Sequence, residues 1–256
     1  MTLPAAPSFR DRLVGAQALI GTFIKSPGVH AIEVLGEVGL DFVVIDAEHA
    51  PWDRGSIDSA ILAARSQSLS ALVRVQSTGD ILTALDCGAT GVMVPHVASA
   101  QIARDVAAAC RYRGGSRGFT NSSRAGRYGG LGLAAHMDEG DGRTAVIAML
   151  EDPRALDEAV EIAQVPGIDA FFLGRGDLTV AMGESSTDAE RVRSAVNLFV
   201  NAVKAANKPL CAFVGKSSEM PALQALGVTT FIISSDQGLL RQAATSELKQ
   251  FRSLAA

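Results

Sequence analysis

The most constraining feature of this sequence is an alternation of two kinds of segment that recurs eight times along the chain. Short runs rich in β-branched and other apolar residues lie at 19–24, 42–46, 71–75, 91–95, 145–150, 170–173, 210–214 and 230–233. Longer runs, with apolar residues at helical spacing, lie at 29–38, 57–66, 81–87, 99–112, 155–165, 188–207, 218–226 and 237–254. Strand followed by helix, repeated in this way, is typical of a parallel sheet covered by helices.

The number of repeats indicates which parallel sheet forms. Eight strand–helix units favour a closed (β/α)8 TIM barrel over an open doubly wound sheet. A dinucleotide-binding fold would carry GxGxxG after its first strand, where this chain reads GTFIKSPG, and the sequence contains no phosphate-binding GxxxxGK[ST] motif. Barrels of about 200–250 residues form one domain, so we predict a single α/β barrel domain over residues 1–256.

Composition narrows the classes of function. The chain is 48% hydrophobic and has a net charge of −4, which argues against disorder and against nucleic-acid binding. It has neither a signal-peptide pattern at its start nor a stretch of about 20 apolar residues that would span a membrane. Its three cysteines lie far apart, without a CxxC pair, and are expected to be buried. We therefore expect a soluble cytoplasmic protein.

One segment breaks the alternation. Residues 113–143 are rich in glycine and are expected to form a long loop between the fourth and fifth strands. The loop carries Arg117, Arg124 and Arg127. Three roles remain open for these arginines: closing over a substrate, contacting another subunit, or lying in solvent.

In a barrel, the active site lies at the carboxyl ends of the strands, so polar residues there are the candidates. An arginine at position 74, between apolar neighbours, should point into the barrel, where it needs an anion or an internal ion pair. The other polar or charged residues at these strand ends are Lys25, Asp46, Glu48, His49, Glu151, Asp152, Arg175, Asp177 and Lys216.

Two pairs of strand-end residues suggest chemistry. Glu151 and Asp177 could hold a hard divalent cation, although a structural role for the pair is equally open. Asp46 and His49 are three residues apart, a spacing at which the carboxylate could orient the imidazole as a base. Trp52 is expected either to line the pocket or to have an ordinary packing role.

The other three histidines, unlike His49, do not have acidic residues beside them at the carboxyl end of a predicted strand. We expect His30, His96 and His136 to be core or surface residues.

Three stretches resemble the HpcH/HpaI aldolase/citrate lyase family, from about residue 9 to the end. They are IGTFIKSPGVHAIEVLGEVGLDFVVIDAEHAP, LVRVQSTGDILTALDCGATGVMVPHV and YRGGSRGF…SSRAGRYG. They look like its short, metal-dependent branch of 2-oxo acid aldolases, which includes the 4-hydroxy-2-oxoheptanedioate and 2-dehydro-3-deoxyglucarate aldolases. The resemblance implies a (β/α)8 barrel that forms a homotrimer or homohexamer, with C-terminal helices exchanged between subunits.

The resemblance also implies a role for each site residue. A divalent ion (Mg²⁺, or else Mn²⁺ or Co²⁺) would be bound by Glu151 and Asp177. Arg74 would contact the keto oxygen of pyruvate, and His49 would act as the catalytic base. Asp46 would be the partner of that base.

The backbone amides of Gly176 and Asp177 would hold the substrate carboxylate. This role would explain a small residue at Gly176.

The implied activity is that of a carbon–carbon lyase. Such an enzyme joins pyruvate, or a related 2-oxo acid such as hydroxypyruvate, to an aldehyde through a metal-stabilised enolate, or cleaves the same bond, in the catabolism of aromatic or sugar acids. Two lysines, Lys25 and Lys216, keep a Schiff-base route open.

The chain departs from the family pattern at Met149, Asp152, His96 and Arg175. These departures bear on the pocket for the aldehyde. Arg175 should either face a carboxylate on the aldehyde or pair with an acidic residue of the chain.

Three alternatives to the aldolase are compatible with parts of the sequence. One is a lyase acting on malyl-CoA or citramalyl-CoA, as in the longer citrate lyase branch of the family. Another is a phosphate-handling barrel isomerase or synthase, although the VGKSSEM and ISSDQG segments match its phosphate loops weakly. The third is a scaffold without catalysis, which the joint presence of five site residues argues against. The identity of the aldehyde stays open.

Overall fold

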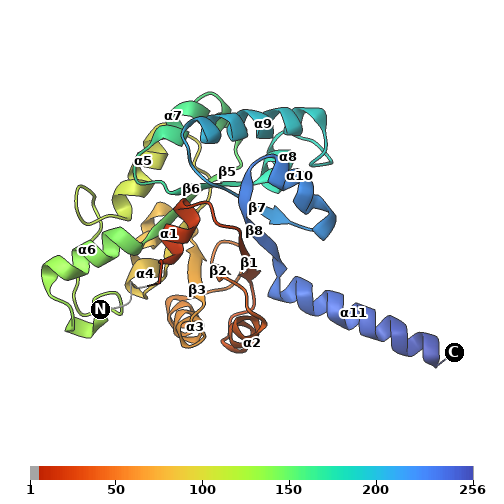
Figure 1. Cartoon of the computed structure of the whole chain (residues 1–256), viewed down its shortest axis with the longest axis horizontal. Coiled ribbons are helices and arrows are strands. Elements are labelled where there is room, and N and C mark those ends of the chain that lie inside the picture. Colours follow the sequence, from red (N-terminus) through yellow and green to blue (C-terminus); the bar gives the residue numbers. More distant parts are fainter. Residues whose placement is uncertain (1–5, 256) are drawn as a thin grey trace.

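A computed structural model describes residues 6–255 of the chain and shows a closed barrel of eight parallel strands in sequence order (Figure 1). Each strand pairs with the next, and the last pairs with the first. The predicted (β/α)8 barrel is therefore confirmed. The strands are β1 Leu19–Ile24, β2 Phe42–Asp46, β3 Ser70–Arg74, β4 Gly91–Val94, β5 Ala145–Leu150, β6 Ala170–Leu173, β7 Leu210–Val214 and β8 Val228–Ser235.

Helices surround the barrel (Figure 1). The main ones are α1 Phe9–Val14, α2 His30–Val38, α3 Arg54–Ser66, α4 Ile81–Asp86, α5 Ala100–Ala109, α6 Leu133–Arg143, α7 Ala159–Gln164, α8 Arg175–Ala181, α9 Glu190–Ala205, α10 Met220–Ala225 and α11 Asp236–Leu254. Short 3₁₀ turns lie at Thr78–Asp80, Arg127–Gly129, Pro153–Leu156 and Ser217–Glu219. The predicted absence of a signal peptide rests partly on residues 1–5, which lie outside the described residues.

The expected loop over residues 113–143 is only partly a loop, because its last third is helix α6. Glycines at 140 and 142 lower the intrinsic helix propensity of this segment, so periodicity alone missed it. Tertiary contacts hold it in place instead. The imidazole of His136, which is 1% exposed, shares hydrogen bonds with the Tyr112 hydroxyl at 3.1 Å and the Asn121 amide oxygen at 3.0 Å.

The core has two layers, as a parallel barrel requires. Alternate residues of each strand face the barrel interior or the surrounding helices, so the strands are buried on both faces. In β2, Phe42 and Val44 pack inside the barrel, whereas Val43 and Ile45 pack against the helices. The three cysteines are also buried, as predicted. This packing holds the ends of the strands in place, and the polar residues lie at these ends.

Helix α11 differs from the other helices because it extends away from the barrel (Figure 1). None of its residues is buried, and three large apolar side chains on it are strongly exposed: Leu240, Phe251 and Leu254. No helix in the described part of the chain combines the length and apolar character needed to span a membrane.

Candidate active site

The carboxyl ends of β2 and β3 bring a buried acid and a buried arginine together. Asp46 and Arg74 are the last residues of these strands and lie opposite each other in the sheet. The Arg74 Nε donates to Asp46 Oδ1 at 2.8 Å, and Arg74 Nη1 lies 3.2 Å from Glu48 Oε2. The ion pair expected as one alternative for Arg74 is therefore present, and the guanidinium is held in a fixed orientation.

Asp46 is almost completely engaged by its neighbours. Its second oxygen lies 2.8 Å from Lys25 Nζ, and its first also accepts the backbone N–H of His49 at 3.2 Å. Burial raises the pKa of this carboxyl, but hydrogen bonds and charge from Lys25 and Arg74 outweigh burial, so the pKa lies below its ordinary value. Asp46 is thus an anion that orients Arg74.

The structure does not bring the Asp46 carboxylate to the His49 imidazole. The three-residue spacing instead closes a turn through the backbone of His49. The ring of His49 is about half exposed, and its Nε2 lies 3.6 Å from Glu48 Oε2. Glu48, and not Asp46, is therefore the carboxylate that faces the imidazole.

A second buried acid follows β5. Glu151 is 3% exposed, and its Oε1 accepts the backbone N–H of His96 at 2.8 Å. The ring of His96 bridges two acids, with Nδ1 3.4 Å from Glu151 and Nε2 3.4 Å from Glu48. We expected His96 to be a core or surface residue. Its position just after a strand end, as Glu48 and Glu151 also are, is the sequence signal that could have placed it here.

His96 also has an unusual backbone. Its φ of 56° lies in the left-handed region, which costs energy for a residue other than glycine. This conformation lets the backbone N–H and the ring of one residue reach the same carboxylate. His96 is therefore part of the site, although its side chain is largely exposed.

Asp177 lies in the first turn of α8, directly after β6. Burial raises the pKa of Glu151 above its ordinary value, and the negative charge of Asp177 raises it further. The buried Glu151 and the exposed Asp177 are two carboxylates that repel each other, and a bound divalent cation would relieve both this repulsion and the cost of burying Glu151. Among residues 6–255, no group of three or more His, Cys, Asp or Glu side chains is arranged to hold a metal.

The turn that starts α8 contains a position, Gly174, where the neighbouring side chain leaves room only for glycine. A Cβ on Gly174 would lie 2.7 Å from Glu151 Oε2 and 2.4 Å from its Cβ, so only glycine fits there. The small residue expected at Gly176 is a different case, because a Cβ there would meet no protein atom within 4 Å and the expectation concerns the approach of a substrate carboxylate. Gly176 and Asp177 lie in the first turn of α8, whose N–H groups have no partner within the helix.

A cavity of about 390 Å³ opens beside these residues. Arg74, Gly176 and Asp177 line it together with aromatic rings from β1, β6 and β7. Arg175 also lines it, but its guanidinium donates to Glu219 at 2.7 Å and to the carbonyl of Phe213 at 3.1 Å. Of the two alternatives for Arg175, pairing with an acidic residue is therefore the one present in the structure.

Two expected residues lie elsewhere. Trp52 is 7% exposed and is absent from the cavity lining; its indole N–H donates to the carbonyl of Ile24 at 3.1 Å, so it packs in the core. Asp152 pairs with Arg154 and is absent from the cavity lining.

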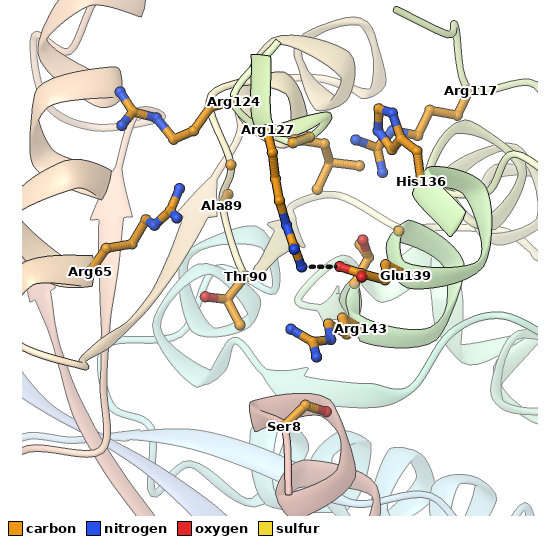
Figure 2. Close-up of a pocket in the computed structure, with 15 residues that line it drawn as sticks. Ser8, Arg65, Ala89, Thr90, Arg117, Arg124, Arg127, His136, Glu139 and Arg143 are labelled. Carbon is orange, nitrogen blue, oxygen red and sulfur yellow. Dashed lines mark hydrogen bonds and ion pairs between the residues drawn. The ribbon is translucent and has the colours of Figure 1, made fainter. Parts of the chain in front are cut away.

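The arginines of the 113–143 segment lie at the other end of the barrel. Arg127 pairs with Glu139 at 2.7 Å, and Arg124 pairs with Asp58 of α3. These arginines share a cavity with Thr90 and with the residue that immediately precedes β5 (Figure 2). A helix-to-strand connection lies at the amino end of a barrel, so in this chain they do not close over the cavity at the carboxyl end.

The fold and site together define a (β/α)8 barrel protein with an arginine and two buried acids at the carboxyl end of the strands. A family model described as HpcH/HpaI aldolase/citrate lyase matches residues 19–243, and the chain belongs to this family. The chain is 30% identical to a hydroxypyruvate/pyruvate aldolase of Delftia acidovorans, over 100% of this chain and 96% of the relative. It is 34% identical to a 4-hydroxy-2-oxovalerate aldolase of Rhodococcus jostii, over 78% and 79%.

Solved structures agree with this assignment. The structure of the citrate synthase SbnG is 30% identical and superposes with a TM-score of 0.87, over 97% of this chain and 98% of that chain.

Proposed function

We propose that this chain is a divalent-metal-dependent aldolase. It would cleave or form a carbon–carbon bond between pyruvate, or a related 2-oxo acid such as hydroxypyruvate, and an aldehyde. The observation that carries the proposal is that Arg74 and Asp177 line one cavity, with Glu151 directly behind the Gly174 turn. The chain's relatives with aldolase names support the choice of reaction.

The oxygen of the 2-oxo acid gains negative charge when the carbon–carbon bond breaks. Arg74 would donate hydrogen bonds to that oxygen, and its two acidic partners hold it in place beforehand. The N–H groups of Gly176 and Asp177 would bind the substrate carboxylate. A divalent cation (Mg²⁺, Mn²⁺ or Co²⁺) held by Glu151 and Asp177 would supply further positive charge to the same oxygen atoms.

Cleavage also requires a base that removes the proton of the 4-hydroxyl group. His49 is the proposed base, because its ring is accessible and lies beside Glu48. Glu48 would stabilise the protonated imidazole, a role that the sequence assigned to Asp46. Asp46 would act instead as a positioning residue for Arg74.

The apolar side chains exposed on α11 support a homo-oligomer. Leu240, Phe251 and Leu254 are between 67% and 85% exposed, which is a costly arrangement for a helix that stays alone in water. We propose a trimer or hexamer in which α11 packs against a neighbouring copy of the chain, in the cytoplasm.

Chelation and trapping test the mechanism. EDTA should abolish aldol cleavage, and Mg²⁺, Mn²⁺ or Co²⁺ should restore it. Borohydride added with pyruvate should leave the activity intact, because Lys25 is engaged by Asp46 and no Schiff base is needed. Inactivation by borohydride, with the mass of reduced pyruvate added to a lysine, would contradict the metal-dependent route.

A Claisen-type reaction on an acyl-CoA thioester is the second candidate. It is favoured by the similarity to citrate synthase SbnG, whose identity of 30% equals that of the Delftia aldolase. Incubation with malyl-CoA or citramalyl-CoA separates the two. Cleavage of the carbon–carbon bond of either thioester, with release of acetyl-CoA and a 2-oxo acid, without any aldol activity would replace the first proposal with the second.

A further inference from the structure

A separate cavity lies at the amino end of the barrel and measures about 340 Å³. Its walls come from the end of α3, the turn before β4, the 113–143 segment and α6 (Figure 2). Thr90, immediately before β4, lies in its wall, so the cavity is at the opposite end of the strands from the candidate active site. Nothing in the proposed aldolase reaction uses it.

Arginines dominate this cavity although the whole chain is acidic. Five arginines line it, from three separate parts of the chain, and Glu139 is the one acidic residue in its described lining. They are Arg65, Arg117, Arg124, Arg127 and Arg143. The chain has a net charge of −4, so this concentration of positive charge is local.

Three of the five arginines have acidic partners. Arg124 pairs with Asp58, and Arg127 pairs with Glu139 at 2.7 Å. Arg117 is buried and lies 4.0 Å from Asp86, while its Nε has no hydrogen-bond partner among the described residues.

The other two, Arg65 and Arg143, form no ion pair within 4.0 Å in residues 6–255. They extend toward the cavity from opposite sides of Thr90 (Figure 2). Asp11 of α1 is close enough to Arg143 for that arginine to help lower the pKa of its carboxyl, although the two side chains form no ion pair within 4.0 Å. Arg65 and Arg143 are thus exposed arginines at the cavity that no described acid binds directly.

We propose that this cavity is a binding site for a small dianion, which would bridge Arg65 and Arg143. Guanidinium groups bind phosphate and carboxylate oxygens through paired hydrogen bonds, so either a phosphoryl group or a dicarboxylate has the required chemistry. Such a ligand would link α3 to α6 beneath the barrel. Its binding does not depend on the proposed aldolase reaction.

Titration calorimetry on the full-length protein tests the site. Sulfate serves as the tetrahedral dianion, succinate as the dicarboxylate, and acetate as the monoanion, all at constant ionic strength maintained with sodium chloride. We expect saturable binding of sulfate or succinate and none of acetate. Arg65→Gln and Arg143→Gln should each weaken binding by about tenfold or more, because a charge-assisted pair is lost.

Arg104→Gln is the matched control, because Arg104 is an exposed arginine on α5 that bonds only to Gln101 in the described structure. It should bind as the native protein does, and circular dichroism confirms that each variant is folded. Equal binding by the native protein and the Arg65→Gln/Arg143→Gln double variant would overturn the proposal, as would no saturable binding of either dianion. Aldolase activity of the double variant is measured in parallel, so failure of the site and failure of the proposed reaction are distinguishable.

Discussion

Arg74 is the buried cation of the site, and its charge needs acidic partners. It is 6% exposed and is held by Asp46 and Glu48 on one side, while its guanidinium lies 4.7 Å from the centre of the Phe23 ring. This arrangement uses the planar fork of the guanidinium, which contacts two acids at once and lies over the Phe23 ring. A buried cation held in this way is prepared before substrate arrives.

Replacing Arg74 by lysine keeps the charge and loses the fork. We expect Arg74→Lys to lower kcat/KM for aldol cleavage by about 10²–10³-fold, the usual effect of removing one preorganised donor to an oxyanion. Steady-state kinetics on protein shown to be folded measures this. The same substitution at exposed Arg104 is the control, and a loss of less than threefold at Arg74 (roughly 0.7 kcal/mol) would contradict the role.

Glu151 affects stability in the opposite sense to most acids in proteins. Its pKa is raised by burial and by Asp177, so the folded chain binds this proton more tightly than the unfolded chain does. Stability of the metal-free protein should therefore fall as the pH rises through the window above the ordinary pKa of glutamate, which is about 4.3. At neutral pH the ionised carboxylate is a net cost unless a cation is bound.

Because the ionised Glu151 carboxylate destabilises the metal-free protein, we expect Glu151→Gln to raise the Tm in EDTA at pH 7. The gain should disappear near pH 4, where the native carboxyl is protonated in both states. Thermal unfolding at several pH values measures it, with the exposed Glu161→Gln as control. A lower Tm for Glu151→Gln in EDTA would show that the buried carboxylate is not destabilising.

At the scale of elements, the junction between β6 and α8 determines whether the two acids can meet. Gly174 follows β6 and is the N-cap residue of α8, and its missing side chain is what allows Glu151 to lie against it. The start of the helix that carries Asp177 thus packs against the acid that follows β5.

Two alanine substitutions at this junction should therefore behave differently. Gly174→Ala should displace the Glu151 carboxylate and weaken Mg²⁺ binding by about tenfold or more, the usual scale for disturbed metal ligands. Gly176→Ala should weaken it much less, because its Cβ meets nothing within 4 Å. Mg²⁺ titration by calorimetry compares them, and equal losses would refute the role given to Gly174.

The elements themselves were largely predictable from the sequence. Apolar periodicity gave strands such as β2 and β5 with the bounds that the structure has, because both faces of these strands are buried. The position of each polar residue at a strand end followed from the direction of the chain. Helix α6 was missed because contacts distant in sequence, and not local propensity, stabilise it.

Side-chain partners were less predictable than elements. Asp46 was assigned to the imidazole of His49, but Arg74 and Lys25 engage its oxygens, and both lie on other strands or loops. His96 was noted only as a departure from the family pattern, and its contact with Glu151, 55 positions away, was not predicted. The positions of residues along the chain indicate which of them lie at the same end of the barrel. Which of these residues contact one another depends on the geometry of the closed sheet.

In the whole molecule, two cavities lined by charged residues lie at opposite ends of the barrel strands. The carboxyl end brings an arginine together with acids, where a cation is proposed to bind, and the amino end brings arginines together around the proposed anion site. Helix α11 extends away from both, with apolar side chains exposed. The barrel therefore offers three surfaces with separate chemistry, of which the carboxyl end is the proposed catalytic one.

Exchange of the methyl protons of pyruvate with deuterium, followed by NMR, tests the central claim most directly, since it needs no knowledge of the aldehyde. The account predicts that the protein with Mg²⁺ accelerates exchange well above the rate with Mg²⁺ alone. EDTA should return it to the uncatalysed rate, and so should the Glu151→Gln substitution. No exchange with any of Mg²⁺, Mn²⁺ or Co²⁺, or undiminished exchange in EDTA, would contradict a metal-dependent aldolase.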